Sequence, residues 1–537
     1  MKMSELVLLG DEAVALGALH AGLSGAYGYP GTPSSEIMEY LINEAEKTKS
    51  FRATWSSNEK TAYEEALGTS IAGKRAIVTM KHVGLNVAAD PFMNSALLKI
   101  NGGLVIVVAD DPGMHSSQGE QDSRFFADFA KVPCFEPTNQ QEAYEMTREA
   151  FDLSEKWKVP VLIRMVTRLA HSRAVITPWD NVRPQNPVHK TDDVKGWMLL
   201  PALAQKLWVE LLETNKEFAS YSETTQFNQL TLNPHYRKVG IITTGLGKNY
   251  FMENLSEMED KPSHLHIGFY PAPVDKIKKL AENVDKILVI EEGYPFLETR
   301  LRGILPQNTE IEGKLDGKVP MTGELDPDVV RPALGLSKIA TRKVEGLPGR
   351  PPQLCQGCPH VDTYEAINLA VKDYPQHLVA SDIGCYSLGA LPPYKAIETI
   401  ICMGASIGTA QGAAEAGLKP ALAVIGDSTF YHSGLTGLVN AVAANAPITL
   451  IILDNSTVAM TGGQTTILPS SKLYPLVIGL GADPAHVKTI VPIKKNLEEN
   501  AAIIKKEMEY DGLSVIISVR ECLEEAKRRI KREALKK

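Results

Sequence analysis

Long apolar runs and alternating strand and helix patterns dominate this chain. Residues 421–425 (ALAVI) and 448–453 (ITLIIL) are almost entirely apolar, and a proline precedes each run. Runs of this length predict central parallel strands that helices cover on both faces. Shorter runs, such as 6–9 and 161–165, alternate with helix-like segments and indicate a mostly parallel sheet. The pattern therefore predicts an α/β fold.

The same pattern divides the 537 residues into three α/β domains with parallel sheets, in line with the usual size of domains. The predicted boundaries are 1–176 for the first domain, 177–237 for a connection with a helix near 203–212, 238–306 for a smaller second domain, 307–353 for a connection that ends rich in glycine and proline, and 354–537 for a third domain with a charged C-terminal helix.

Composition narrows the class of protein. Hydrophobic residues make up 44% of the chain and charged residues 22%, which is ordinary for a globular enzyme. The net charge of −8 argues against a nucleic-acid partner. No apolar stretch is long enough to cross a bilayer, and the N-terminus lacks the hydrophobic region of a signal peptide. We expect a cytoplasmic protein with no membrane partner, and its six cysteines do not form a secreted disulfide framework.

Polar residues follow both long apolar runs directly. Gly426-Asp427-Ser428 comes after the first run, and Asn455 comes after the second. Ligands bind at the carboxyl ends of strands in open α/β sheets, and Mg²⁺ takes one or two carboxylates together with phosphate oxygens. Asp427 and Asn455 are therefore candidate ligands for Mg²⁺. The arrangement resembles the one by which thiamine diphosphate enzymes anchor their cofactor with Asp, Asn and a nearby backbone carbonyl, which would here be that of Thr457. Such a pair arises easily by chance, but the flanking strands and the following Met460–Gln464 segment strengthen the prediction.

Glu59 opens a predicted helix in the first domain. An acid in a first helical turn commonly does no more than complement the helix dipole. The functional alternative is a glutamate that hydrogen-bonds the aminopyrimidine of thiamine and so lets the cofactor lose its thiazolium proton. Because Glu59 and the metal motif lie in separate α/β domains, as thiamine enzymes require, we favour the second interpretation.

Two further segments end strands at the predicted edge of the first sheet. Thr32 lies in a strand-to-helix turn that could bind the carboxylate of a 2-oxo acid, although an ordinary capped turn explains it equally. His82, in the company of Lys81 and Asn86, could face the substrate or could be an unrelated surface histidine.

The cysteines form a second group of candidates. The segment Cys355–His360 (CQGCPH) could be half of a zinc site, a redox pair or half of a cluster site. Cys385 and Cys522 could complete a set of four thiolates if the fold brings them together. Cys134 and Cys402 are expected to be small buried hydrophobic residues.

Taken together, these motifs resemble the alpha-subunit family of indolepyruvate:ferredoxin oxidoreductase, within the thiamine-dependent 2-oxo acid:ferredoxin oxidoreductases. The segments that carry the resemblance are Gly28–Glu36, Asn58–Lys60, Met80–Asn86, Ala88–Pro91, Cys355–His360, Asp382–Cys385, Gly426-Asp427 and Met460–Gln464. It implies a pyrimidine-binding domain, a transketolase-C-like domain and a diphosphate-binding domain, in that order. It also implies that Glu59 activates the cofactor, that Thr32 and His82 line the substrate pocket, and that Cys358 and His360 contact cofactor.

The activity implied by the resemblance is oxidative decarboxylation of an arylpyruvate to aryl-acetyl-CoA, with electrons passed to ferredoxin. The implied partners are coenzyme A, ferredoxin or a ferredoxin-like protein, and a small beta subunit in a dimer of heterodimers. Two alternatives remain open. One is a non-oxidative arylpyruvate decarboxylase or a ligase-associated homologue. The other is a catalytically silent scaffold, which the presence of Glu59, Asp427 and Asn455 disfavours.

One departure from the family pattern concerns iron. Family members usually carry a ferredoxin-like domain with two Cys-x₂-Cys-x₂-Cys-x₃-Cys-Pro runs, and this sequence contains no such run. It also has Gln356 where the family commonly has proline. Related pyruvate and 2-oxoglutarate enzymes hold a cluster near thiamine with four cysteines. The corresponding positions, which predict one [4Fe–4S] cluster here, are Cys355, Cys358, Cys385 and Cys522.

Overall fold

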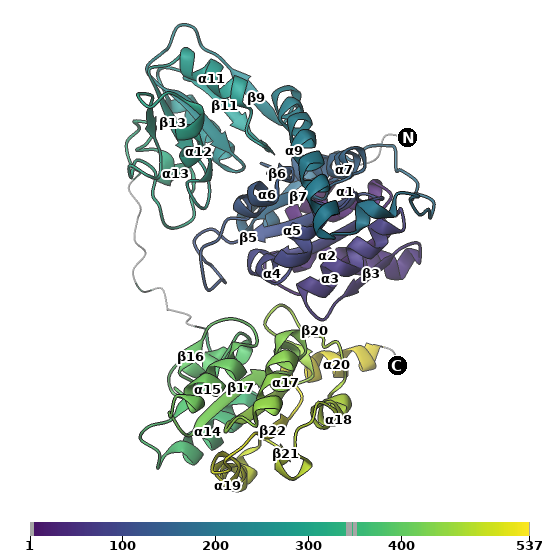
Figure 1. Cartoon of the computed structure of the whole chain (residues 1–537). Coiled ribbons are helices and arrows are strands. Elements are labelled where there is room, and N and C mark those ends of the chain that lie inside the picture. The colour runs from purple at the N-terminus through teal and green to yellow at the C-terminus, as the bar shows by residue number, and fades with distance from the viewer. Residues whose placement is uncertain (1–4, 340–345, 347–351, 536–537) are drawn as a thin grey trace. The chain divides into compact units, whose positions relative to one another are not determined.

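The computed structural model describes residues 5–339, 346 and 352–535. These residues fall into two compact units, Met1–Lys343 and Val344–Lys537, which are considered separately (Figure 1). Both units combine mostly parallel sheets with helices, so the predicted α/β class is confirmed.

The larger sheet of the first unit is parallel except at one edge. Its order within the described residues is β12 (Phe269–Tyr270), β6 (Cys134–Phe135), β7 (Val161–Val166), β5 (Leu104–Asp110), β4 (Ala76–Lys81), β2 (Gly25–Gly28) and β3 (Arg52–Trp55). Only the β12–β6 pair among them is antiparallel. The accompanying helices are α1 (Gly10–His20), α2 (Ser35–Thr48), α3 (Glu59–Ile71), α4 (His82–Val87), α5 (Ala89–Ser95), α6 (Arg124–Ala130), α7 (Gln140–Trp157) and α8 (Thr167–His171). The strand predicted at 6–9 is β1 (Leu6–Leu9), which forms a separate antiparallel pair with β8 (Arg173–Ile176).

A smaller sheet completes this unit. Its order is β14 (Glu310–Glu312), β13 (Lys286–Ile290), β10 (Gly240–Thr244), β11 (Ser263–Ile267) and β9 (Asn228–Thr231), and β9 is antiparallel to β11. Its helices are α9 (Pro201–Thr224), α10 (Gly247–Asn254), α11 (Val274–Glu282), α12 (Phe296–Ile304) and α13 (Pro327–Val330). β9 and β14 lie in segments predicted as connections, and α9 is much longer than the predicted helix near 203–212.

Two buried arginines contact both sheets, Arg124 through an ion pair and Arg164 through a 3.4 Å hydrogen bond to the carbonyl of Glu292. Arg164 in β7 donates to Asp110 at the end of β5, with Nε and Oδ2 2.6 Å apart, and also pairs with Glu136. Arg124 pairs with Glu291, which directly follows β13, at 2.9 Å. Both guanidinium groups are fully buried, so these carboxylates must supply the charge balance that water supplies elsewhere.

The second unit contains one parallel sheet. Its order is β16 (Thr399–Ile400), β15 (Leu378–Ser381), β17 (Ala421–Gly426), β18 (Thr449–Asp454), β22 (Ser514–Val519) and β21 (Val487–Ile490). Its helices are α14 (Pro359–Val371), α15 (Ala405–Glu415), α16 (Asp427–Thr429), α17 (Leu435–Ala444), α18 (Leu473–Gly479), α19 (Leu497–Met508) and α20 (Leu523–Leu535). A small hairpin of β19 (Thr457–Val458) and β20 (Gln464–Thr465) follows β18.

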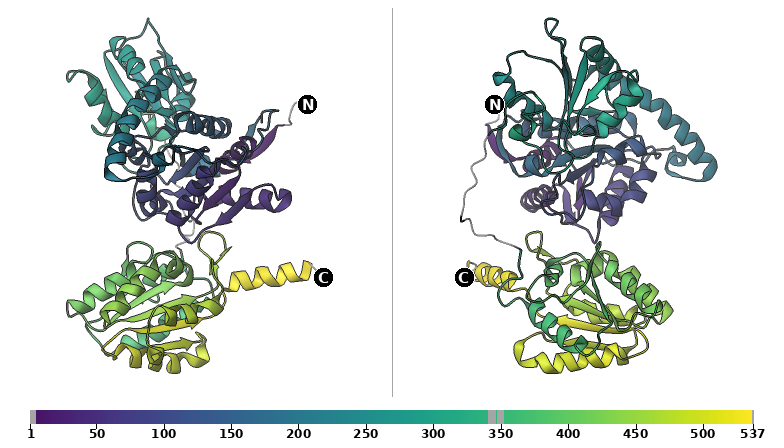
Figure 2. Two further views of the ribbon diagram at one scale, coloured as in Figure 1. Left: turned by 45° about the vertical axis from the view of Figure 1, so that its right-hand side comes forward. Right: turned by 90° about the vertical axis from the view of Figure 1, so that its left-hand side faces the viewer.

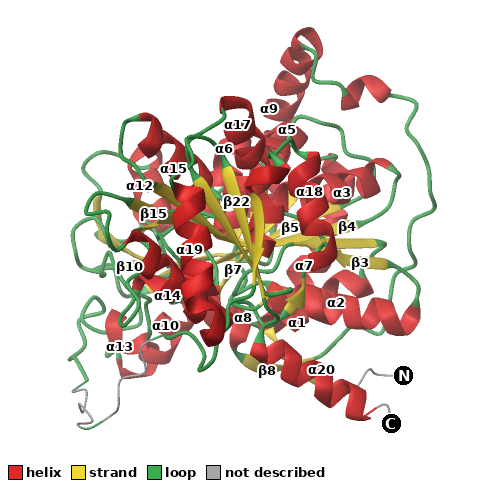
Figure 3. Cartoon of the chain, turned by 90° about the horizontal axis from the view of Figure 1, so that it is seen from below, coloured by secondary structure: helices red, strands yellow, loops and turns green. Residues whose placement is uncertain are grey.

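Both faces of this sheet are buried, as the apolar runs predict. Ala423 and Ile425 of β17 pack into a core with α15, α17 and α18, whereas Leu422 and Val424 pack into a second core with α14 and α19. Helices from both sets flank the strands in Figure 3. Alternate residues of a strand point to opposite faces, so a strand buried on both sides is apolar at most of its positions.

The charged helix α20 extends away from the rest of its unit in Figure 2, and most of its side chains are partly or fully exposed. Its basic bias is therefore that of a solvated helix. Among the described residues, no helix has both the length and the apolar character needed to span a membrane.

The buried arginines generate a stability prediction. We expect Arg164→Ala to lower the unfolding free energy of the first unit by about 3–5 kcal/mol, because it leaves buried carboxylates without their counter-charge. Arg168→Ala is the matched control, since Arg168 pairs with Glu324 while 42% of its side chain is exposed, and such pairs contribute only about 0–1 kcal/mol. Differential scanning calorimetry of both variants would compare them. Equal melting temperatures would contradict this role for Arg164.

Candidate functional site

The polar residues at the ends of β17 and β18 lie side by side. The two strands are parallel neighbours, with Gly426 opposite Leu453, so Asp427 and Asn455 emerge at the same edge of the sheet. Asp427 Oδ1 accepts a hydrogen bond of 2.6 Å from the backbone of Ser428, and its Oδ2 accepts one of 2.9 Å from Ser456. The structure thus brings together the pair that the sequence predicted as magnesium ligands.

A second carboxylate, which the sequence analysis missed, stands beside Asp427. Burial and the nearby charge of Asp454 raise the pKa of Asp427 to about 7. Asp454 Oδ1 accepts from Ser470 Oγ at 2.7 Å, whereas its buried Oδ2 has no hydrogen-bond partner among the described residues. Two adjacent buried acids, one with an unpartnered oxygen, fit a divalent cation with oxygen ligands. The signal for Asp454 in the sequence was its position directly before Asn455, at the end of the same apolar run.

His360 joins this site from α14. Its Nε2 lies 3.3 Å from Asn455 Nδ2, and burial lowers the pKa of His360 to about 4, so the ring is neutral and can accept. Asn455 Oδ1 accepts from the backbone of Thr457 at 3.1 Å. Thr457 begins the β19–β20 hairpin, whose turn contains the Met460–Gly463 segment, and its hydroxyl donates to Gln464 O at 3.0 Å. His360, Asn455 and Thr457 therefore form one connected group.

Gly426 leaves space for an aromatic ring. A Cβ atom at Gly426 would lie 2.6 Å from the ring of Tyr386, so no larger residue fits without displacing that ring. The Tyr386 hydroxyl donates to Asp382, and burial raises the pKa of Asp382 to about 6. The backbone of Ser406 also donates to Asp382, at 3.2 Å. These contacts fix the loop after β15 against the Gly-Asp segment, a role for Tyr386 that the sequence analysis missed.

Four cysteine thiols gather next to this group. Burial raises the pKa of Cys385 to about 12, and the thiols of Cys358, Cys522 and Cys355 contribute to that rise. The backbone of Cys358 donates to Cys355 O at 2.9 Å, and a Cβ at Gly357 would lie 3.1 Å from a methyl group of Leu523, next to Cys522. The fold therefore collects Cys355, Cys358, Cys385 and Cys522, as the sequence prediction requires.

The remaining cysteines lie elsewhere. Cys134 is buried in β6, as expected for a small hydrophobic residue. Cys402 is exposed, so the prediction that it is buried was wrong. It lies in the turn that precedes α15 rather than within a strand or helix, which explains its access to solvent.

In the first unit, Glu59 lies against the backbone of α4. Glu59 is 6% exposed and opens α3, where the Asn58 side chain caps the helix by accepting from Thr61 N at 2.8 Å. A Cβ atom at Gly84 would lie 2.6 Å from Glu59 Oε1, so the glycine permits a close approach to the carboxylate. The carboxylate is thus held in a defined buried position rather than on an exposed first turn.

His82 and Lys81 lie at the end of β4. Both ring nitrogens of His82 are buried and have no hydrogen-bond partner among the described residues. Burial lowers the pKa of His82, with the charge of Asp110 opposing the shift, so the ring is neutral. Lys81 Nζ donates to Ser116 O at 2.8 Å, and burial lowers the pKa of Lys81 too. A buried, neutral imidazole at this strand end could hydrogen-bond a substrate.

Thr32 lies beside these residues. Its turn closes through a 2.8 Å bond from Ser34 N to Gly31 O and leads into α2. A Cβ atom at Gly31 would lie 3.1 Å from Cβ of Lys81, so the turn packs directly on the end of β4. Thr32 is partly exposed. The Thr32 turn and the Lys81–His82 segment therefore share one edge of the sheet.

Two protein-family models match the chain. The model described as pyruvate flavodoxin/ferredoxin oxidoreductase, thiamine diphosphate-binding, matches residues 16–204. The model described as thiamine pyrophosphate enzyme, C-terminal TPP binding domain, matches residues 382–518. The first range contains Thr32, Glu59 and His82, and the second contains Asp427 and Asn455. The candidate residues of each unit therefore lie in a segment similar to a thiamine-binding domain.

A solved structure shares the fold. It is a 2-oxoglutarate:ferredoxin oxidoreductase from Magnetococcus marinus, with 2-oxoglutarate, coenzyme A and succinyl-CoA bound. The TM-score is 0.50 at 17% sequence identity, over 61% of this chain and 64% of that one.

Sequence relatives extend over almost the whole chain. The indolepyruvate oxidoreductase subunit IorA of Archaeoglobus fulgidus is 37% identical over 96% of this chain and 86% of its own length. The corresponding subunit of Methanothermobacter thermautotrophicus is 34% identical over 97% and 87%, and that of Pyrococcus horikoshii is 37% identical over 96% and 86%. The chain therefore belongs to the family of indolepyruvate oxidoreductase IorA subunits.

Proposed function

We propose that this chain is the large, thiamine diphosphate-binding subunit of a heteromeric 2-oxo acid:ferredoxin oxidoreductase that acts on an arylpyruvate of the indolepyruvate type. The observation that carries the proposal is the pairing of Asp427 with Asn455 at the ends of β17 and β18, within a chain related to IorA subunits over 96% of its length. We assign residues 1–176 to a pyrimidine-binding domain, 238–306 to a transketolase-C-like domain and 354–537 to a diphosphate-binding domain.

Asp427, Asn455 and the Thr457 carbonyl would hold Mg²⁺ and, through it, the diphosphate. Asp454 Oδ2 has no hydrogen-bond partner among the described residues, and burial and the charge of Asp454 raise the pKa of Asp427. A bound cation would compensate the charge of both carboxylates, which supports this assignment. Ser428 and His360 orient the ligands, because Ser428 donates to Asp427 and His360 contacts Asn455. When bound, thiamine diphosphate supplies a carbon nucleophile and an electron sink for decarboxylation.

The protein would contribute proton control and substrate positioning in the first unit. Glu59 would hold a proton at the aminopyrimidine nitrogen, and its close contact with Gly84 fixes the carboxylate for that role. The Thr32 hydroxyl and the neutral His82 ring would hydrogen-bond the 2-oxo acid, since neither ring nitrogen of His82 has a partner among the described residues.

The proposed overall reaction requires coenzyme A and an electron acceptor. A 2-oxo acid and coenzyme A give an acyl-CoA, CO₂ and a proton, while two electrons reduce two ferredoxins. The carbon–carbon bond to the carboxylate breaks, and a thioester bond to the coenzyme A sulfur forms. We therefore propose a small beta subunit that completes the site and binds coenzyme A, in an assembly of two alpha and two beta subunits.

The first electron carrier would be one [4Fe–4S] cluster held by Cys355, Cys358, Cys385 and Cys522. Each thiol is near enough to influence the pKa of another, as Cys355 and Cys522 do for Cys358. Among the described residues, no three of these sulfur atoms lie within 4.8 Å of one another. That spread suits a cluster, whose thiolates bind separate irons, better than a single zinc ion.

The proposed activity can be tested on the chain purified anaerobically with its partner subunit. We expect ferredoxin reduction that requires both indolepyruvate and coenzyme A, with indoleacetyl-CoA as the product by mass spectrometry. Glu59→Gln should keep cofactor affinity but lower turnover by about 10²–10⁴-fold, because it removes a positioned proton-transfer group. Glu64→Gln, on the exposed face of the same helix, is the matched control. Release of free aldehyde without ferredoxin reduction would instead establish a non-oxidative decarboxylase.

The metal assignment predicts a binding defect in Asp427→Ala. We expect this variant to lose Mg²⁺-dependent affinity for thiamine diphosphate in isothermal titration, because the diphosphate loses its bridge to the protein. Asp511→Ala is the control, since the Asp511 side chain is 88% exposed. Unchanged affinity in Asp427→Ala would refute the assignment of Asp427 as a metal ligand.

The cluster assignment predicts iron on the chain. Anaerobically purified protein should contain about four iron and four sulfide per chain, the content of one [4Fe–4S] cluster. Cys358→Ser should lose most of this iron, whereas Cys402→Ser should retain it, because Cys402 lies outside the group of four. A chain without iron, or equal iron in both variants, would eliminate the cluster from this subunit.

A further inference from the structure

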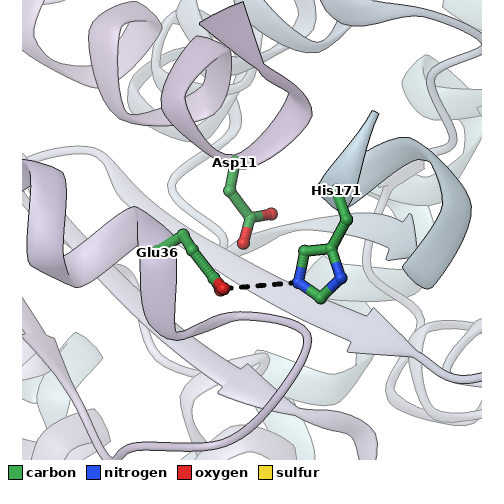
Figure 4. A group of neighbouring side chains, drawn as sticks. All are labelled: Asp11, Glu36 and His171. Atoms are coloured by element: carbon green, nitrogen blue, oxygen red, sulfur yellow. Dashed lines mark ion pairs between the residues drawn. The ribbon is translucent and has the colours of Figure 1, made fainter. Parts of the chain in front are cut away.

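Three side chains that are distant in the sequence converge in the first unit. Asp11 lies in the first turn of α1, Glu36 lies in the first turn of α2, and His171 ends α8. One ligand atom from each lies within 4.8 Å of those of the other two. The described part of the chain holds no second group of three histidine, cysteine or acidic residues this close together. Figure 4 shows the Asp11 carboxylate directed toward the space between Glu36 and His171.

Asp11 is buried beside a second acid rather than beside a donor that would explain its burial. The residue is 0% exposed, and the one side chain near enough to hydrogen-bond its carboxylate is Glu36, which could do so only by sharing a proton; no other described group donates to it. Burial raises the pKa of Asp11 well above its usual range, and the negative charges of Glu36 and Glu12 raise it further. One oxygen of Glu36, Oε2, is likewise buried without a partner. Buried polar atoms are normally satisfied, so this group of oxygen atoms requires an explanation.

The start of α1 lies very close to the backbone of α8 at Gly10. A Cβ atom at Gly10 would lie 2.2 Å from the carbonyl oxygen of Leu169, so only glycine lets α1 begin so close to α8. The backbone of Gly10 also donates to Ser172 O at 3.2 Å. First-turn positions favour acids through the helix dipole, which accounts for Asp11 and Glu36 separately. It does not account for two acids that share one space with an imidazole.

We propose that Asp11, Glu36 and His171 form a binding site for a divalent transition-metal cation, of which zinc and manganese are the representative ions. Imidazole together with two carboxylates is a donor set that suits these metals. Glu36 Oε1 and His171 Nε2 are 3.4 Å apart. Two ligands bound at tetrahedral zinc distances are separated by roughly 3.3 Å, so this pair needs little movement.

The site is open to solvent on one side. The side chains of His171 and Glu36 are 36% and 35% exposed, whereas Asp11 closes the interior end. An ion can therefore enter from water and keep water at its remaining positions, as in sites with three protein ligands. It would join the starts of α1 and α2 to the end of α8. Because α2 directly follows the Thr32 turn, the ion would hold that turn in place.

Manganese binding to the full chain tests the proposal. Without thiamine diphosphate, free Mn²⁺ is measured by electron paramagnetic resonance during titration of wild type, Asp11→Asn and His171→Gln. Other sites, including the thiols and Asp427, are the same in all three proteins and cancel in the comparison. We expect wild type to bind one more ion than either variant. The affinity lost should be at least about 10–100-fold, since even residues that only orient metal ligands cause losses of that size.

A control variant and a crystal soaked in zinc complete the test. Glu46→Gln removes an exposed carboxylate from the same helix, α2, and should bind as wild type does. The exposed position of His171 lets that variant fold even if Asp11→Asn does not. Crystals soaked in zinc should show anomalous scattering between the three side chains. If wild type and both variants bind equal numbers of Mn²⁺ ions, the proposal is overturned and Asp11 is a protonated acid that shares a proton with Glu36.

Discussion

Two fully buried arginines, Arg124 and Arg164, contact both sheets of the first unit: Arg124 through an ion pair with Glu291, and Arg164 through a 3.4 Å hydrogen bond to the carbonyl of Glu292. Arg164 anchors Asp110 at the end of β5, and the charge of Asp110 in turn reaches the neutral ring of His82. Arg124 fixes Glu291 at the end of β13 in the smaller sheet. A guanidinium can satisfy several carboxylates at once because its donors point in fixed directions. The ends of strands from two sheets are therefore held at fixed separations by charge rather than by apolar packing alone.

The cost of burying a charge distinguishes two kinds of acid in this chain: those with an ion-pair partner and those without one. Every carboxylate beside the buried arginines has its counter-charge within the chain. Asp427 and Asp454 adjoin each other with no cation among the ion pairs of the described residues, and so do Asp11 and Glu36 apart from the single imidazole of His171. Desolvation is costly for an ionised group without compensation. Among the described residues, Asp382 is another buried acid without an ion-pair partner, but it accepts hydrogen bonds from Tyr386 and Ser406. The two carboxylate pairs are the positions that we propose as cation sites, one for the diphosphate of the cofactor and one that the family assignment does not require.

Prediction from the sequence succeeded where a local pattern carries the physics. Apolar runs identified β17 and β18 because strands buried on both faces are mostly apolar, and the residues after them were then placed at one sheet edge. Prediction was less successful for features that depend on contacts between residues far apart in the sequence. The strand β12 pairs with β6 although 134 residues separate Tyr270 from Glu136 at that edge. The exposure of Cys402 and the meeting of residues 11, 36 and 171 also depend on how separate elements pack, which no local spacing encodes.

In the second unit, a backbone hydrogen bond links the proposed cofactor site to one of the four cysteines. The amide of Cys522 donates to the carbonyl of Asn455 at 3.0 Å, so the strand end that would bind magnesium also positions a thiol. The reaction proposed above releases two electrons, whereas each ferredoxin accepts one. A chain that runs it needs a one-electron carrier close to where the electrons appear. The proposed cluster, near Asn455, Cys522 and Cys385, would meet that need within the second unit.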